Sequence, residues 1–130
     1  MFSIRYNHDD DLSAFKQYYD MEIEQPVITI RYQAKTGFCL MLLHRFTKDK
    51  QLTAHIVSHG KWASKRLFNH LFTFIFDELG FKKVIAPINR KNRKIRKLIR
   101  QLGFDKIKEN GSDELHELDK NRCRYYGIFK

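Results

Sequence analysis

The 130-residue chain has little cysteine, proline or glycine, with 2, 2 and 6 residues of these types. Cys39 and Cys123 lie far apart and belong to no Cys-x-x-Cys or Cys/His cluster, so zinc and redox motifs have no support. No stretch approaches the roughly 18 apolar residues that a membrane-spanning helix needs. The start, "MFSIRYNHDDD", has no apolar run of signal-peptide length. We therefore expect a cytoplasmic protein with free thiols, no metal and no membrane partner.

Acidic residues are scarce in the middle of the chain. Residues 33–108 hold 18 Lys and Arg residues against 4 Asp and Glu residues, and the whole chain has a formal net charge of +10. A surface of this kind attracts phosphates, nucleic acid or an acidic protein. The hydrophobic content of 42% fits a folded protein, and the length fits one domain over residues 1–130.

The pattern of apolar residues predicts a mixed α/β fold. Strands are expected where apolar residues alternate or run densely, at 2–6, 27–32, 38–46, 51–57, 82–88, 104–109 and 122–129. Helices are expected near 10–19, over 63–79 and over 91–102, and Asp10 or Asp11 is expected to cap the first. The stretch "NGSDELHELDKN" reads as a polar loop. Strands and helices alternate in the second half, which predicts parallel pairing there, with the last two helices packed on one mixed sheet.

The stretch "RKNRKIRKLIRQLGF", from Arg90 to Phe104, predicts an unusually basic helix. Its apolar residues form one stripe, and seven Lys and Arg residues cover the rest without an acid between Asn89 and Phe104. Like charges four residues apart repel each other by a few tenths of a kcal/mol per pair. Two interpretations stay open: a solvated outer face, or a surface that meets cofactor phosphates, nucleic acid or an acidic protein.

A second anion signal is "HGKWASK", where Gly60 is expected to end a strand shortly before a helix begins. A glycine there allows backbone to approach a ligand, and the free N–H groups of the helix start point at it. Lys61 and Lys65 add positive charge. Many strand-to-helix turns contain glycine and bind nothing, so the turn alone is a weak signal.

The ordered set "QLTAHIVS", "HGKWAS", "FIFDELGF", "KKVIAPI", "NRKN" and "IRQLGF" resembles the GNAT superfamily of N-acetyltransferases. The opening "FSIRYNHDDDLSAF" is similar to the first strand and helix of that family. More narrowly, the chain resembles small phage-encoded GNAT-like proteins, which have Gly-Arg/Lys-Trp in the turn and a final strand comparable to "YYGIF".

The resemblance implies a central mixed, partly splayed sheet flanked by helices, with acetyl-CoA bound between two parallel strands. It also implies direct attack of an amine acceptor on the acetyl thioester, in a bacterial host cytoplasm if the protein is phage-encoded. The pyrophosphate would lie on backbone N–H groups from Gly60 to Lys65. The implied cofactor-binding residues are Val57, His59, Gly60, Lys61, Trp62, Ala63, Ser64, Lys65, Asn89 and Asn92.

The chain departs from the family at the positions that matter for catalysis. Trp62 stands in place of the central glycine of the turn, and Ile99 stands where a tyrosine often acts as general acid. His55 is the nearest titratable substitute for the usual glutamate base, and Tyr126 is a candidate acid. The alternatives are a packed or surface His55, a Trp62 that anchors the core, and a fold without catalysis that binds nucleic acid or a host protein through its basic 90–100 face.

Overall fold

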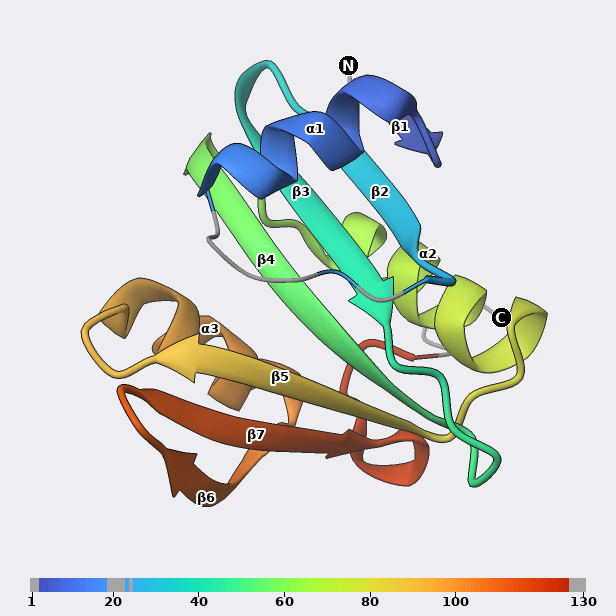
Figure 1. Ribbon diagram of the computed structural model, residues 1–130, viewed down its shortest axis with the longest axis vertical. Helices are drawn as coiled ribbons and strands as arrows, with labels where there is room; N and C mark the ends of the chain where they lie inside the picture. Colours follow the sequence, from blue (N-terminus) through green and yellow to red (C-terminus); the bar gives the residue numbers. More distant parts are fainter. Residues whose placement is uncertain (1–2, 19–22, 24, 127–130) are drawn as a thin grey trace. The chain divides into compact units, whose positions relative to one another are not determined.

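The structure is a computed structural model that describes residues 3–18, 23 and 25–126 (Figure 1). The chain divides into two compact units. One comprises residues 1–45 and 54–63, and the other comprises residues 46–53 and 64–130. The expectation of one domain over residues 1–130 stays a prediction.

The first unit consists of an antiparallel sheet with one helix. Its elements are β1 (Ser3–Tyr6), α1 (Asp9–Tyr18), β2 (Ile28–Gln33), β3 (Thr36–His44) and most of β4 (Gln51–Lys61). β2 pairs antiparallel with both β1 and β3. Helix α1 lies across β2 and β3 (Figure 1) and buries Phe15 against Leu40 and Leu42, which gives this unit its core.

An ion-paired carboxylate links α1 to the strands. The helix begins at Asp9, so the prediction that Asp10 or Asp11 is its cap is wrong. Asp11 is instead buried in the first turn, where its carboxylate accepts a hydrogen bond from Arg5 Nε at 2.7 Å and lies 3.5 Å from Arg31. Burial acts to raise the pKa of Asp11, but the bond and charge of Arg5 outweigh it, so the pKa is lowered.

The second unit combines strands with two further α-helices. Its elements are the first residues of β4, α2 (Lys65–Thr73), the π-helical turn η1 (Phe74–Glu78), β5 (Lys83–Asn89), α3 (Arg93–Leu102), β6 (Asp105–Asn110), β7 (Asp113–Asp119) and the 3₁₀ turn η2 (Lys120–Arg122). β4 pairs with β5 in parallel over three residues, Gln51–Thr53 with Lys83–Ile85. β7 pairs antiparallel with β5 and β6, so among the described strands the predicted parallel pairing in the second half holds only between β4 and β5. The strand order β1-β2-β3-β4-β5-β7-β6 confirms the predicted mixed sheet.

Two predicted elements near the C-terminus are wrong. The expected polar loop contains β7, in which Glu114, His116 and Leu118 are buried and alternate with less buried neighbours. The buried face of β7 is largely polar, so its alternation of buried and less buried residues gives no hydrophobic pattern in the sequence. The expected last strand at 122–129 is absent from its described part, where η2 is followed by turn residues up to Tyr126. Residues 127–130 lie outside the described residues.

The two predicted helices of the second unit form, and each begins two residues later than predicted. Ser64 caps α2, so this helix begins at Lys65 and not at Ala63. The buried side chains of α2 and η1 are Leu67, Phe68, Leu71, Phe72, Ile75 and Phe76. Gly103 ends α3 with a left-handed φ of 112°, as predicted for a glycine C-cap. No helix among the described residues is long and apolar enough to cross a membrane, and both cysteines are free, as expected.

Candidate functional site

The end of β4 carries the first part of the predicted cofactor segment. Val57 packs beside the Phe15 cluster, and the exposed ring of His59 lies 6.4 Å from the ring of Phe38. Lys61 is exposed, and its carbonyl accepts a hydrogen bond from Thr36 Oγ1 at 3.1 Å. This part of the segment is therefore held by β3 and the core of the first unit, and its histidine and lysine side chains face solvent.

Gly60 has a structural reason to be glycine. It lies inside β4 with φ at +72°, a conformation that L side chains rarely adopt. A Cβ at this position would lie far inside contact distance of the Thr36 carbonyl oxygen and close to Gly37. The sequence predicted a close approach of the Gly60 backbone to a ligand, whereas the close approach in the structure is to the backbone of β3. A substitution of Gly60 therefore tests folding before it tests a ligand.

Trp62 and Ser64 also have structural roles. The indole of Trp62 is 5% exposed, which agrees with the core-anchor interpretation. Ser64 is the N-cap of α2, and its Oγ accepts a hydrogen bond from Leu67 N at 3.1 Å. Ala63 and Lys65 are exposed. The first turn of α2 contains no acidic residue, so the positive end of the helix dipole is not neutralised from within.

His55 lies in a buried histidine pair. Its Nε2 atom is 2.9 Å from Nε2 of His44, and both rings are buried, with His55 7% exposed. Phe15 packs edge-on against His55 with ring centroids 6.1 Å apart. Burial and the neighbouring charges of His44 and Arg45 lower the pKa of His55 to about 4, so the ring is neutral at pH 7. The sequence did not point to His44, although strands joined by a short turn favour such cross-strand pairs.

Tyr126, the candidate acid, belongs to a cluster in the second unit. Its hydroxyl donates a hydrogen bond to the carboxylate of Asp77 in η1. Its ring packs edge-on against Phe76, with centroids 5.2 Å apart, and Lys120 Nζ lies 5.3 Å from its centroid. Tyr126 thus ties the segment after η2 to the end of the α2–η1 helix. Asp77 was not predicted, because its partner lies 49 residues away in the sequence.

The two asparagines shape the turn that leads from β5 into α3. Asn89 Oδ1 accepts a hydrogen bond from Lys91 N at 2.9 Å. Asn92 is the N-cap of α3, and its Oδ1 accepts from Ile95 N at 3.3 Å. Both side chains are exposed at the surface. Each amide therefore uses its oxygen to stabilise the turn and keeps an NH₂ group that can donate to an anion.

Some of the charge around the basic helix is balanced by tertiary contacts that the sequence did not reveal. Arg96 binds the buried carboxylate of Glu114, with Nε 3.0 Å from Oε1, and Lys106 Nζ lies 3.4 Å from Oε2. His116 Nε2 is 3.1 Å from the same carboxylate. Burial acts to raise the pKa of Glu114, but these hydrogen bonds and charges lower it. Arg90 donates to the Gly111 carbonyl.

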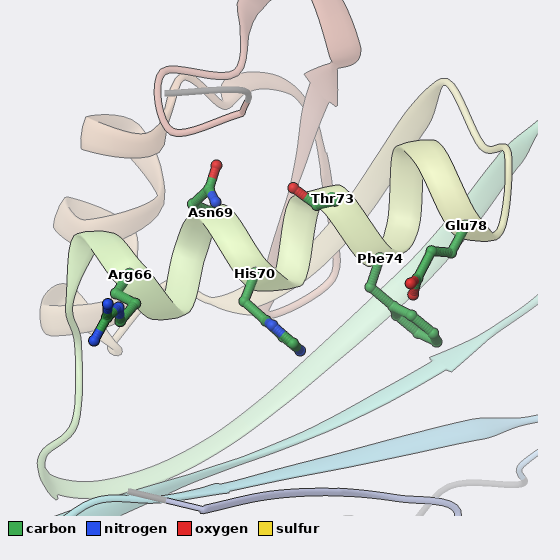
Figure 2. A pocket seen from close by; sticks show the side chains of 6 residues that line it. All are labelled: Arg66, Asn69, His70, Thr73, Phe74 and Glu78. Atoms are coloured by element: carbon green, nitrogen blue, oxygen red, sulfur yellow. The ribbon is translucent and has the colours of Figure 1, made fainter. Parts of the chain in front are cut away.

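A cavity of about 370 Å³ lies along α2 and η1 (Figure 2). Its lining residues are Arg66, Asn69, His70, Thr73, Phe74 and Glu78. Figure 2 shows Arg66, His70, Phe74 and Glu78 projecting from one side of the helix, and Asn69 and Thr73 from the other. The sequence did not predict this cavity. Its lining is chemically mixed and contains none of the predicted site residues.

No family profile matches the sequence, and no curated protein matches it. Solved structures do match. A spermidine N-acetyltransferase from Vibrio cholerae in a dodecameric form is 13% identical, with a TM-score of 0.70 over 99% of this chain and 98% of that chain. A mutant form of the spermidine/spermine N-acetyltransferase SpeG from the same organism is 14% identical, with a TM-score of 0.69 over 93% and 96%.

FdhC, described as a nucleotide-linked sugar GNAT, is 14% identical, with a TM-score of 0.65 over 93% of this chain and 88% of that chain. At such low identity the match concerns the path of the backbone, and it covers nearly all of each chain. The chain therefore has the fold of the GNAT N-acetyltransferases.

Proposed function

We propose that the chain is an N-acetyltransferase that moves the acetyl group of acetyl-CoA to an amine acceptor. The observation that carries the proposal is the likeness to solved acetyltransferases over almost the whole chain. The ordered motifs from Gln51 to Phe104 support it independently. We further propose that the chain is related to the small phage-encoded GNAT-like proteins and that it is located in the cytoplasm.

The start of α2 fits the pyrophosphate of acetyl-CoA. The first N–H groups of a helix have no acceptor within it, and Ser64 Oγ accepts from only one of them, Leu67 N. The side chains of Lys61, Lys65 and Arg66 are exposed around this turn. We therefore keep Gly60–Lys65 as the proposed phosphate-binding segment, with Val57 and His59 before it. We also propose Asn89 and Asn92, whose side-chain NH₂ groups can donate to an anion, as cofactor-binding residues.

Acetyl transfer by direct attack asks little of side chains. The deprotonated amine forms a bond to the thioester carbonyl carbon, the tetrahedral oxyanion collapses, and the C–S bond breaks. The amine then loses a proton and the CoA thiolate gains one. We propose that His55 accepts the proton that the amine loses and that Tyr126 donates a proton to the CoA thiolate. Backbone N–H groups would stabilise the oxyanion.

His55 and Tyr126 each interact with another side chain, and these interactions determine how readily they exchange a proton. His55 is neutral at pH 7 and has an acceptor nitrogen, but a pKa of about 4 makes it a weak base. The Tyr126 proton points at Asp77, so it must turn from that carboxylate to reach a thiolate. Slow catalysis is therefore the expectation, with a rate set by proton transfer.

A second function is favoured by specific departures from the family pattern. Ile99, in the place of the usual tyrosine, is 1% exposed and belongs to the core of α3, and Trp62 is buried as well. With His55 buried too, the fold would serve as a basic binding module without catalysis. Its ligand would then be nucleic acid or a host protein.

Two measurements test the proposal. Release of CoA thiol is followed with acetyl-CoA and a panel of amines: spermidine, an amino sugar nucleotide and a lysine peptide. Thermal unfolding is followed with acetyl-CoA at increasing concentration, where binding at 100 times Kd adds about 2.7 kcal/mol of stability. A shift with thiol release supports the enzyme, and a shift without release supports the binding module. No shift at millimolar acetyl-CoA would rule out the acetyltransferase.

A further inference from the structure

The outer face of α3 carries a regular row of positive charge. Arg93, Lys97 and Arg100 follow at i, i+4 and i+7, and all three are exposed. They lie on the side of the helix opposite the buried Ile95, Ile99 and Leu102. At 1.5 Å per residue the three side chains leave the helix about 6 Å and then about 4.5 Å apart along its axis. We call Arg93, Lys97 and Arg100 the α3 stripe.

The nearby carboxylates are used by other cations. Glu114 binds Arg96 and Lys106. Glu109 lies 2.9 Å from Lys106 and 3.7 Å from Arg90. These contacts neutralise the flanks of the helix on the side of β6 and β7.

The α3 stripe itself keeps its charge. Within residues 3–18, 23 and 25–126, no carboxylate lies within ion-pair distance of Arg93, Lys97 or Arg100. Like charges at i and i+4 raise the free energy of an isolated helix, and here no internal acid offsets them. An external anion would remove this repulsion.

We propose that the α3 stripe binds the phosphate backbone of nucleic acid. The charges have one sign and a near-regular spacing, which suits a nucleic acid, since it carries a phosphate at every nucleotide. Two of the three side chains are arginines, whose planar guanidinium binds phosphate in a bidentate manner. The stripe contains no aromatic or large apolar side chain, whereas protein-binding surfaces usually have such a centre. Nucleic acid therefore fits better than an acidic protein.

The stripe offers phosphate contacts without an arrangement for reading base edges, so binding should not depend on sequence. The proposal does not rest on acetyl transfer. It uses neither the start of α2 nor His55 nor Tyr126, and each can fail without the other.

Fluorescence anisotropy of a labelled 20-base-pair DNA duplex tests the proposal with the full chain. Three phosphate contacts predict a salt slope of about −2.7, which weakens binding about 40-fold between 50 and 200 mM salt. The variant R93Q/K97Q/R100Q should lose most of this slope, since glutamine keeps the helix propensity but removes the charge.

The matched control is K35Q/K48Q/K82Q, which removes the same charge from exposed lysines outside α3. It should keep most of the slope. Equal losses in the two variants would show an effect of net charge alone and overturn the proposal, as would the absence of saturable binding at 50 mM salt. Equal displacement of the duplex by poly-glutamate at the same charge concentration would assign the stripe to acidic proteins instead. Circular dichroism of both variants at 25 °C confirms that each remains folded.

Discussion

Stability should fall as the pH drops from 7.5 to 5, because His55 is buried as a neutral ring. Its pKa is about 4 in the folded chain against an ordinary 6.5. When folding lowers the pKa of a group, the free energy of unfolding is unaffected at a pH above the pKa of the unfolded chain. It decreases as the pH falls from that value toward the pKa of the folded chain. At 1.36 kcal/mol per pKa unit the whole loss is about 3 kcal/mol, of which about 2 kcal/mol appears by pH 5.

The assay is urea unfolding followed by fluorescence of Trp62, the only tryptophan, which is buried in the same unit as His55. The window above pH 5 avoids most of the titration of carboxylates. The variant His55→Gln cannot titrate and should have a nearly flat profile, while His59→Gln, a change at an exposed ring, should keep the parent profile. A parent that loses less than about 0.5 kcal/mol between pH 7.5 and 5 would refute the reasoning, and so would a His55→Gln variant that keeps the full dependence.

Other changes have sharply different expectations. Gly60→Ala adds a methyl group against the backbone of β3 and also introduces strain at positive φ. Gly111→Ala is the control, because Gly111 also has positive φ but has open space around it. In chemical denaturation, Gly60→Ala should lower the free energy of unfolding by about 1–3 kcal/mol more than Gly111→Ala does. Ser64→Ala should lose about 1 kcal/mol of stability and Ser64→Gly only a few tenths, and equal losses would contradict the capping role. If Tyr126 supplies a proton, Tyr126→Phe should lower kcat much more than Asp77→Asn does; similar effects of both on Tm, without any on kcat, would leave the pair with a structural role.

The sequence predicted the elements that have a strong period. The stripe Ile95, Ile99 and Leu102 and the glycine at 103 defined α3 almost to the residue. The β-branched and apolar runs located β2 to β5 within a few residues. In these segments burial and local propensity agree, so the pattern alone suffices.

The errors occur where tertiary contacts replace apolar burial. β7 turns Glu114 and His116 inward, because Arg96 and Lys106 approach from α3 and β6 to satisfy the carboxylate. A buried polar residue with distant partners leaves no periodic hydrophobic signal. The same holds for Asp11, whose partner Arg5 comes from the preceding strand.

The candidate site shows a related limit. The position of Gly60 was noticed correctly, but its physical cause was not visible, since the atoms that exclude a Cβ belong to Thr36 on the neighbouring strand. The pairing of His55 with His44 likewise needed the register of two strands. The sequence therefore indicated that Gly60 is constrained, but not the contact that constrains it.

The proposed phosphate site consists mainly of backbone N–H groups, so it is compatible with side chains that depart from the GNAT pattern. Phosphate binding at the start of α2 would depend on N–H groups, which every non-proline residue supplies, so it makes little demand on side-chain identity. Proton transfer depends on particular side chains, and here Ile99 is a core residue and His55 is buried beside His44. Binding of acetyl-CoA is thus the more robust half of the proposed function, and turnover is the half that His55 and Tyr126 must supply.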